Sequence, residues 1–105
     1  MIYISGAISK CLHKADARFE KAEQMLNKAF FGEPVFNPCE AFKKHRGEWD
    51  SEAFINASLD VLKKATAMAV IQDDCLDYCR SEGVAAELEL AERLDIFVFY
   101  IQIKE

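Results

Sequence analysis

The sequence predicts a single α/β domain, residues 1–105, in which an open parallel sheet carries helices on both faces. Two observations predict this class. Short continuous apolar runs alternate along the chain with longer segments in which apolar residues recur at helical spacing. The chain has 105 residues, of which 51% are hydrophobic, which suffices for one domain with a core of two or three layers.

The first half of the chain contains two predicted strands and one predicted helix. Residues 1–5 form a short apolar run that stops at Gly6, as expected of a strand buried on both faces. Residues 13–30 place alanine, leucine and phenylalanine at helical spacing with charged residues on the other faces, which predicts a core-facing helix. Residues 34–38 predict a short edge strand that is interrupted by proline.

The second half adds two helices and two strands. Residues 39–49 are mostly polar and predict a connection with room for one helical turn, followed by a helix over 50–65. Residues 67–72 and 96–103 predict apolar strands, and residues 81–94 predict the helix between them. This alternation predicts right-handed crossovers and a flavodoxin-like or Rossmann-like three-layer fold, with four to five strands in the order 2-1-3-4.

A carboxylate falls on the apolar face of the last predicted helix. Ser81 is a good N-cap for this helix. At about 100° per residue, Glu87 projects near the middle of an apolar arc that contains Gly83 and Leu94, whereas the other glutamates of this segment project elsewhere. A buried carboxylate must be neutralised, paired or used in chemistry. Glu87 is therefore either a rim residue paired with a Lys or Arg, or a functional residue.

The predicted fold also indicates where a ligand would bind. In an open parallel sheet the ligand site lies beyond the carboxyl ends of the strands, where the strand order reverses, here between the first and third strands. Free N–H groups at the start of the last helix can bind an anion such as phosphate, and Gly83 allows a close approach. We expect the following residues to meet there: Ser5, Gly6, Ser9, Asp73, Asp74, Ser81, Gly83 and Glu87.

Two further features have open interpretations. Residues 43–46, Lys-Lys-His-Arg, form the basic cluster of the sequence, which is either a solvated loop or a site for a phosphate or carboxylate. Trp49, just before the next helix, is either a hydrophobic staple or an aromatic lid over a ligand base.

Several function classes lack the motifs that they require. There is no GxGxxG and no GxxxxGK[ST], so a dinucleotide cofactor and a P-loop hydrolase both lack support. No GxSxG elbow follows a strand, and the two histidines, His13 and His45, make a Ser-His-Asp hydrolase hard to build. What remains is a carboxylate nucleophile or base with neighbouring hydroxyls, and carboxylates are the usual means of displacing a group from an anomeric carbon.

Charge, hydropathy and cysteines limit the partners. The net charge of -5 argues against a nucleic-acid polymer, and no apolar run reaches the roughly 18 residues of a membrane helix. With no signal-peptide pattern we expect a cytoplasmic protein whose four cysteines are reduced. Cys75 and Cys79 are not spaced as a zinc knuckle. We expect no metal and no cofactor.

Three motifs in order resemble the nucleoside 2-deoxyribosyltransferase-like superfamily: Tyr3-Ile4-Ser5-Gly6-Ala7, Val35-Phe36-Asn37-Pro38 and Ser81-x-Gly83-x-x-x-Glu87-x-x-x-Ala91. The resemblance covers nearly the whole chain and is closest to short phage-type and bacterial members. It implies that Glu87 attacks the anomeric carbon of the sugar, expels the base and leaves a glycosyl-enzyme intermediate. It also implies that Tyr3 positions this glutamate, and that Ser81 contacts a 5′-phosphate, as a serine does in the related deoxynucleoside monophosphate N-glycosidases.

The chain departs from the family pattern at several positions. Ala7 and Ser9 stand where those glycosidases have a serine and an arginine for the phosphate. Ser58 aligns with the family aspartate that acts on the leaving base, and Asp60 lies two residues further on. Thr66 replaces an aspartate that usually opens the third strand. Either Asp73 or Asp74 supplies the missing acid, or the chemistry has been lost.

The expected function is an N-glycosidase or deoxyribosyltransferase that acts on a deoxynucleoside or its 5′-monophosphate. The alternatives are a catalytically inactive nucleotide-binding module of the same fold and a structural or interaction protein. Members of the resembled family commonly assemble, so we expect a homodimer or larger homo-oligomer. Aromatic residues of the final strand, Phe97, Phe99 and Tyr100, are either its interface or part of the core.

Overall fold

A computed structural model describes residues 1–6, 12–72 and 82–103, and these form an α/β fold around a parallel sheet. The sheet has four strands in the order β2-β1-β3-β4, and all three neighbouring pairs are parallel. This order and direction confirm the predicted flavodoxin-like arrangement. The strands are β1 (Ile2–Ser5), β2 (Val35–Phe36), β3 (Ala67–Gln72) and β4 (Phe97–Gln102).

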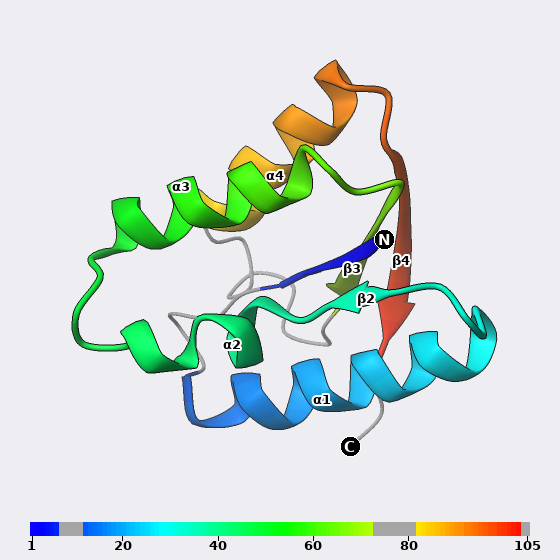
Figure 1. Cartoon of the computed structure of the whole chain (residues 1–105), viewed down its shortest axis with the longest axis horizontal. Coiled ribbons are helices and arrows are strands. Elements are labelled where there is room, and N and C mark those ends of the chain that lie inside the picture. The colour runs from blue at the N-terminus through cyan, green and yellow to red at the C-terminus, as the bar shows by residue number, and fades with distance from the viewer. Residues whose placement is uncertain (7–11, 73–81, 104–105) are drawn as a thin grey trace.

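Helices cover both faces of this sheet (Figure 1). On one face lies α1, and on the other α3 and α4 pack side by side. No helix in the described part of the chain is long and apolar enough to cross a membrane. The helices are α1 (Leu12–Ala29), α2 (Pro38–Ala41), the 3-10 turn η1 (Lys43–His45), α3 (Ser51–Leu62) and α4 (Glu82–Arg93).

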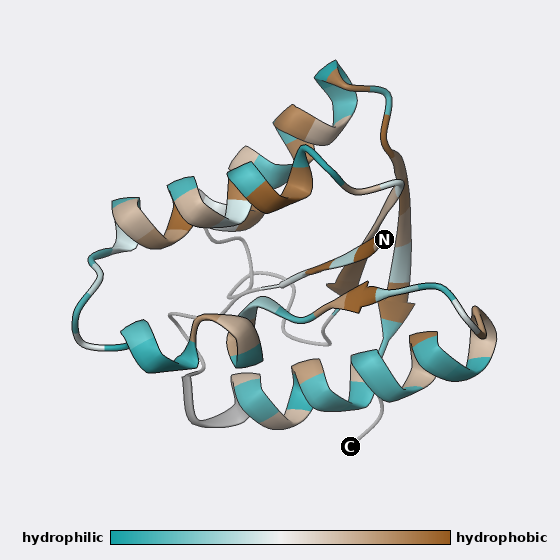
Figure 2. Ribbon diagram, viewed as in Figure 1, coloured by the Kyte–Doolittle hydropathy of each residue, from teal (hydrophilic) through white to brown (hydrophobic). Residues whose placement is uncertain are grey.

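Alternation along β1 divides the core into two layers. Ile2 and Ile4 pack against α1, whereas Tyr3 packs against α3 and α4. The strands are correspondingly mostly apolar, while the exposed sides of the helices are polar (Figure 2). Because side chains alternate, Tyr3 and Ser5 point into the same layer as α4.

The connection between β2 and α3 is more regular than its polar composition predicted. Asn37 caps α2 by accepting a hydrogen bond from the backbone N–H of Glu40 at 3.3 Å. Arg46, from the basic cluster, forms a two-pronged ion pair with Asp16 of α1 and donates to the carbonyl oxygen of Cys39. This cation therefore ties the connection to α1.

The ends of the predicted helices also need correction. Asp50, placed inside a helix by the sequence pattern, is the N-cap of α3, and its side chain accepts a hydrogen bond from Ala53 N–H at 2.8 Å. Leu94, expected on the buried face of the last helix, lies beyond the end of α4 and is exposed. The chain turns there through Asp95, whose positive φ of 54° ends the helical geometry.

Removing the cap of α3 tests this local assignment. Asp50→Ala should lower the free energy of unfolding by about 1 kcal/mol, because a helix N–H loses its acceptor. Urea denaturation measures the change. Asp50→Asn, which keeps a side-chain acceptor, should remain close to the wild type; an equal loss in both variants would contradict the capping role.

Candidate functional site

Glu87 lies in the middle of α4 on the side that faces the sheet. Its side chain is buried, with a relative exposure of 6%. One turn further along, Ala91 is fully buried among the residues that surround Tyr3 and Met68. The small side chain of Ala91 therefore lies where α4 packs on the sheet. The exposure of Glu87 itself confirms its predicted burial.

The carboxyl end of β1 supplies the first partner of this carboxylate. Ser5, the last residue of β1, donates a hydrogen bond from its Oγ to Glu87 Oε1 at 3.2 Å. Both residues are buried, and they are separated by 82 positions in the sequence. The bond therefore joins the end of a central strand to α4, at the edge of the sheet where the fold class places ligands.

Tyr3 lies two residues earlier on the same side of β1. Its phenol interacts with the carboxylate of Glu87 and with the hydroxyl of Ser58. Glu87 Oε2 and Ser58 Oγ are buried and have no hydrogen-bond partner of normal geometry among the described residues. Burial and the nearby carboxylate raise the pKa of Tyr3 far above its usual range, so the phenol stays protonated and can act as a donor.

Burial also changes the protonation of Glu87. Removal from water raises its pKa to about 7, while the interactions with Tyr3 and Ser5 oppose that rise. No ion pair within the described ranges involves Glu87, which favours the functional interpretation over a rim residue paired with a cation. A carboxyl group that titrates near neutral pH can serve as nucleophile, general base or general acid.

Ser58, on α3, completes a buried polar group around Tyr3. It is 3% exposed, and its Oγ lacks a partner within the described part of the chain. By contrast, Asp60 is exposed and pairs with Lys63 at 3.5 Å, so it does not replace the acid that Ser58 lacks. Thr66 donates to the carbonyl oxygen of Met1 at 3.1 Å, at the amino edge of the sheet and away from Glu87.

Gly6 has a packing reason for being glycine. A Cβ at this position would lie 3.1 Å from a ring carbon of Phe19, closer than most such contacts in proteins. Gly6, a predicted site residue, therefore lies close to the α1 side of the core. Gly83 lies in the first turn of α4 and is half-buried.

Other predicted site residues cannot be placed. Ser9, Asp73, Asp74 and Ser81 lie outside the described residues, as do Cys11, Cys75 and Cys79. Cys39 is a buried free thiol whose pKa is raised by burial to about 12, so it is not a reactive nucleophile. Among the described residues no group of three His, Cys, Asp or Glu could hold a metal ion.

The sequence did not reveal an aromatic series that leads away from the site. Phe36 of β2 stacks on Tyr3 with ring centroids 5.7 Å apart, and Phe42 packs against Phe36 at 5.7 Å. Trp49 follows at 5.4 Å from Phe42, and His45 stacks parallel to Trp49 at 4.0 Å. Trp49 therefore packs within the connection, with one face of its ring against His45, and Phe36 supports the ring of Tyr3.

Comparison with known protein families gives a match over most of the chain. The model of a protein family described as "Domain of unknown function (DUF4406)" matches residues 1–100. No curated protein matches the chain, and no solved structure matches it.

The buried carboxyl group makes the stability of the fold depend on pH. Between the ordinary pKa of 4.5 and about 7, the unfolded chain has released the proton of Glu87 while the folded chain retains it. Stability should therefore fall as pH rises through this interval and level off above it, by roughly 3 kcal/mol in total. Glu87→Gln should match the wild type at about pH 4 and exceed it by that amount at about pH 8.

Urea denaturation across this pH range measures the effect. The matched control is Glu89→Gln, which removes a carboxylate from the exposed side of the same helix, where it pairs with Arg93. It should keep the pH dependence of the wild type. Parallel curves for Glu87→Gln and the wild type would show that Glu87 ionises freely in the folded state.

Proposed function

We propose a function from the site and from the resemblance in sequence, because the chain belongs to the family described as "Domain of unknown function (DUF4406)", a description that assigns no activity. The proposed function is an N-glycosidase or 2-deoxyribosyltransferase that acts on a deoxynucleoside or its 5′-monophosphate. Glu87 is the proposed nucleophile. This proposal joins the resemblance in sequence to the geometry around one carboxylate.

The observation that carries the proposal is the different environment of the two oxygens of Glu87. Oε1 accepts a hydrogen bond from Ser5, whereas Oε2 is buried and has no hydrogen-bond partner of normal geometry in the described part of the chain. A buried polar atom of this kind is costly to a fold and is rare where it has no use. A carboxylate whose position is fixed through one oxygen, and whose other oxygen accepts no hydrogen bond, is suited to attack an electrophilic carbon.

The reaction would proceed in two displacements. A Glu87 oxygen forms a bond to the anomeric carbon as the bond to the base nitrogen breaks, and the base leaves with the electron pair. A water molecule or an acceptor base then attacks the same carbon and releases the carboxylate. The proton for the leaving base must come from a group other than Ser58, because a serine hydroxyl is a poor acid near neutral pH.

Tyr3 and Ser5 are proposed to orient the nucleophile. Both hydroxyls come from one face of β1 and interact with the carboxylate, and both lower its pKa against the effect of burial. Phe36 stacks on the ring of Tyr3 and restricts its movement. The strand therefore supplies donors whose positions are set by the sheet instead of by a flexible loop.

The proposal extends to the location of the protein and to its cofactor requirement. We propose that the protein acts in the cytoplasm on small molecules, without a cofactor. The buried thiol of Cys39 is compatible with a reducing environment.

Loss of the carboxylate tests the reaction directly. The protein is incubated with deoxynucleosides and their 5′-monophosphates, with and without an acceptor base, and free base is followed by chromatography. Glu87→Ala should reduce base release at least roughly 1,000-fold, as removal of a catalytic nucleophile does. Glu89→Gln should retain activity, and product formed only with the acceptor would identify a transferase. Release that persists in Glu87→Ala would exclude Glu87 as nucleophile.

The pH profile tests the role of Tyr3. For an ionised nucleophile, kcat/KM should rise about tenfold per pH unit below the pKa of about 7 and then level off. Tyr3→Phe removes a donor that lowers the pKa of Glu87, so the rise should move to higher pH. A profile that keeps its midpoint in Tyr3→Phe would contradict the proposed interaction.

A nucleotide-binding module without catalysis is the second candidate, and Ser58 favours it. This uncharged residue is buried beside Tyr3 at the position where the resembled family has an acid. The assay above separates the two candidates. Nucleotides that raise the melting temperature but remain intact would identify a binding module.

A further inference from the structure

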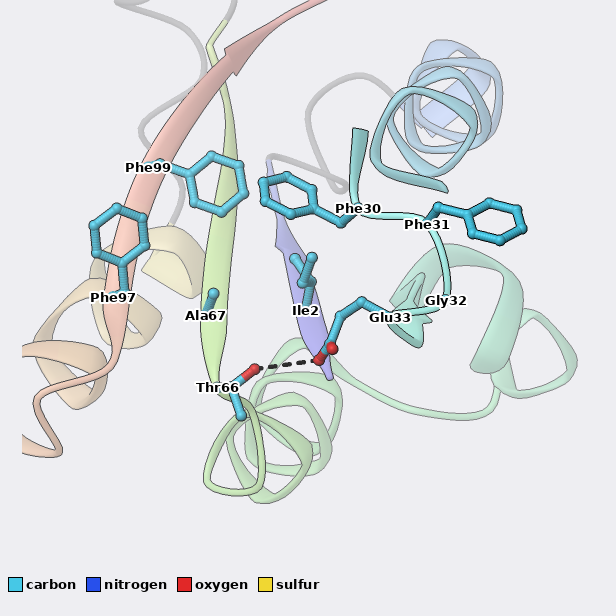
Figure 3. A pocket seen from close by; sticks show the side chains of 9 residues that line it. All are labelled: Ile2, Phe30, Phe31, Gly32, Glu33, Thr66, Ala67, Phe97 and Phe99. Carbon is cyan, nitrogen blue, oxygen red and sulfur yellow. Dashed lines mark hydrogen bonds between the residues drawn. The ribbon is translucent and has the colours of Figure 1, made fainter. Parts of the chain in front are cut away.

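A concave surface lies at the amino ends of the strands, at the opposite end of the sheet from Glu87. It is a groove of about 720 Å³, and its walls are mostly apolar (Figure 3). Phe97 and Phe99 of β4 form one side of the groove. Phe30, which follows α1, lies next to Phe99. We call this surface the aromatic groove and define it by Phe30, Phe97 and Phe99.

The three rings form one continuous surface. Ring centroids lie 5.8 Å apart between Phe97 and Phe99 and 5.7 Å apart between Phe99 and Phe30. Phe97 is nevertheless 67% exposed, and Phe30 is exposed as well. These rings are exposed because α3 and α4 cover the opposite face of the sheet, and because α1 ends at Ala29, before it reaches the groove. Contiguous exposed aromatic surface of this kind marks interaction sites.

One of the residues that line the groove is an exposed aromatic side chain at its rim. Phe31 is 96% exposed and points away from the other three rings (Figure 3). The turn that carries it is completed by Gly32 at a φ of 88°, a left-handed conformation that glycine adopts without strain. The molecule thus presents a projecting ring and an apolar groove next to each other on one surface.

We propose that two copies of this chain associate through this surface, with Phe31 of each copy in the aromatic groove of the other. A two-fold axis requires a self-complementary patch, in which a projection and its receptor lie on the same molecule. The adjacent Phe31 and aromatic groove meet that requirement. This dimer rests on a different surface from the proposed function and does not depend on it.

The charge on this surface is compatible with a second copy as the occupant. The chain carries a net charge of -5, so two copies repel each other overall, and contact through a surface without unpaired charges adds least to that repulsion. Glu33 is the charged residue among those that line the groove, and it is ion-paired with the amino group of Met1 at 2.7 Å. Strand β4, from Phe97 to Gln102, contains no charged residue. The surface is therefore one on which two acidic molecules can meet.

The available area is also of the right order. From their exposed fractions, Phe30, Phe31 and Phe97 offer about 400 Å² per copy, taking roughly 200 Å² for a whole phenylalanine. A standard interface buries about 800 Å² per partner. Three side chains would thus provide about half of the area, and the apolar and backbone surface around them would provide the rest.

Light scattering coupled to size-exclusion chromatography tests the proposal on the whole chain at about 100 μM, where an interface with a Kd of about 10 μM is largely associated. The wild type should have the mass of a dimer. Phe31→Asp and Phe97→Asp should each have the mass of a monomer, with unchanged circular dichroism. Any base release that depends on Glu87 should be the same in Phe31→Asp as in the wild type.

Tyr100→Asp provides the matched control. Tyr100 is 55% exposed on the same strand but, because side chains alternate, it points to the opposite face from Phe97 and Phe99. This variant adds the same charge and should remain a dimer. A monomeric wild type, or a dimer that Phe31→Asp leaves intact, would overturn the proposal. Assemblies that keep growing with concentration would also overturn it, because they require head-to-tail contacts that do not close.

Discussion

The constraint on which the site depends is the burial of one carboxylate between a helix and a sheet. Glu87 lies where α4 packs on the sheet, and its removal from water raises its pKa to about 7. Hydroxyl groups compensate for only part of that cost, and within the described residues no ion pair does so. A group that costs stability and titrates near neutral pH is typical of functional sites, where proteins give up stability for reactivity.

A single strand provides both the core and the partners of this carboxylate. In β1 the residues Ile2 and Ile4 pack against α1, whereas Tyr3 and Ser5 face the opposite layer. Because β1 lies between β2 and β3, its position is set by backbone pairing on both sides. The two hydroxyls are therefore held by the most constrained element of the sheet, which suits a group that must be oriented accurately.

The two ends of the parallel strands, called here the carboxyl edge and the amino edge of the sheet, carry different kinds of surface. The carboxyl edge holds the polar group around Glu87, and the amino edge holds the aromatic groove and Phe31. The difference follows from the layers, since helices cover the strands near Glu87 on both faces while α1 ends before it reaches the amino end of β4. Association through the amino edge would not cover the carboxyl ends of the strands, where Glu87 lies.

The sequence by itself determined the order of elements, the parallel sheet and the burial of Glu87, because hydrophobic periodicity is a local property that the fold preserves. The fold class and the resemblance predicted Ser5 and Tyr3 near this carboxylate, but only the tertiary structure decided the contacts that these side chains make. The bond from Ser5, the position of Ser58 beside Tyr3 and the exclusion of Asp60 depend on how α3 and α4 pack on β1. Such contacts join residues far apart in the chain, and neither spacing nor composition encodes a distance between them.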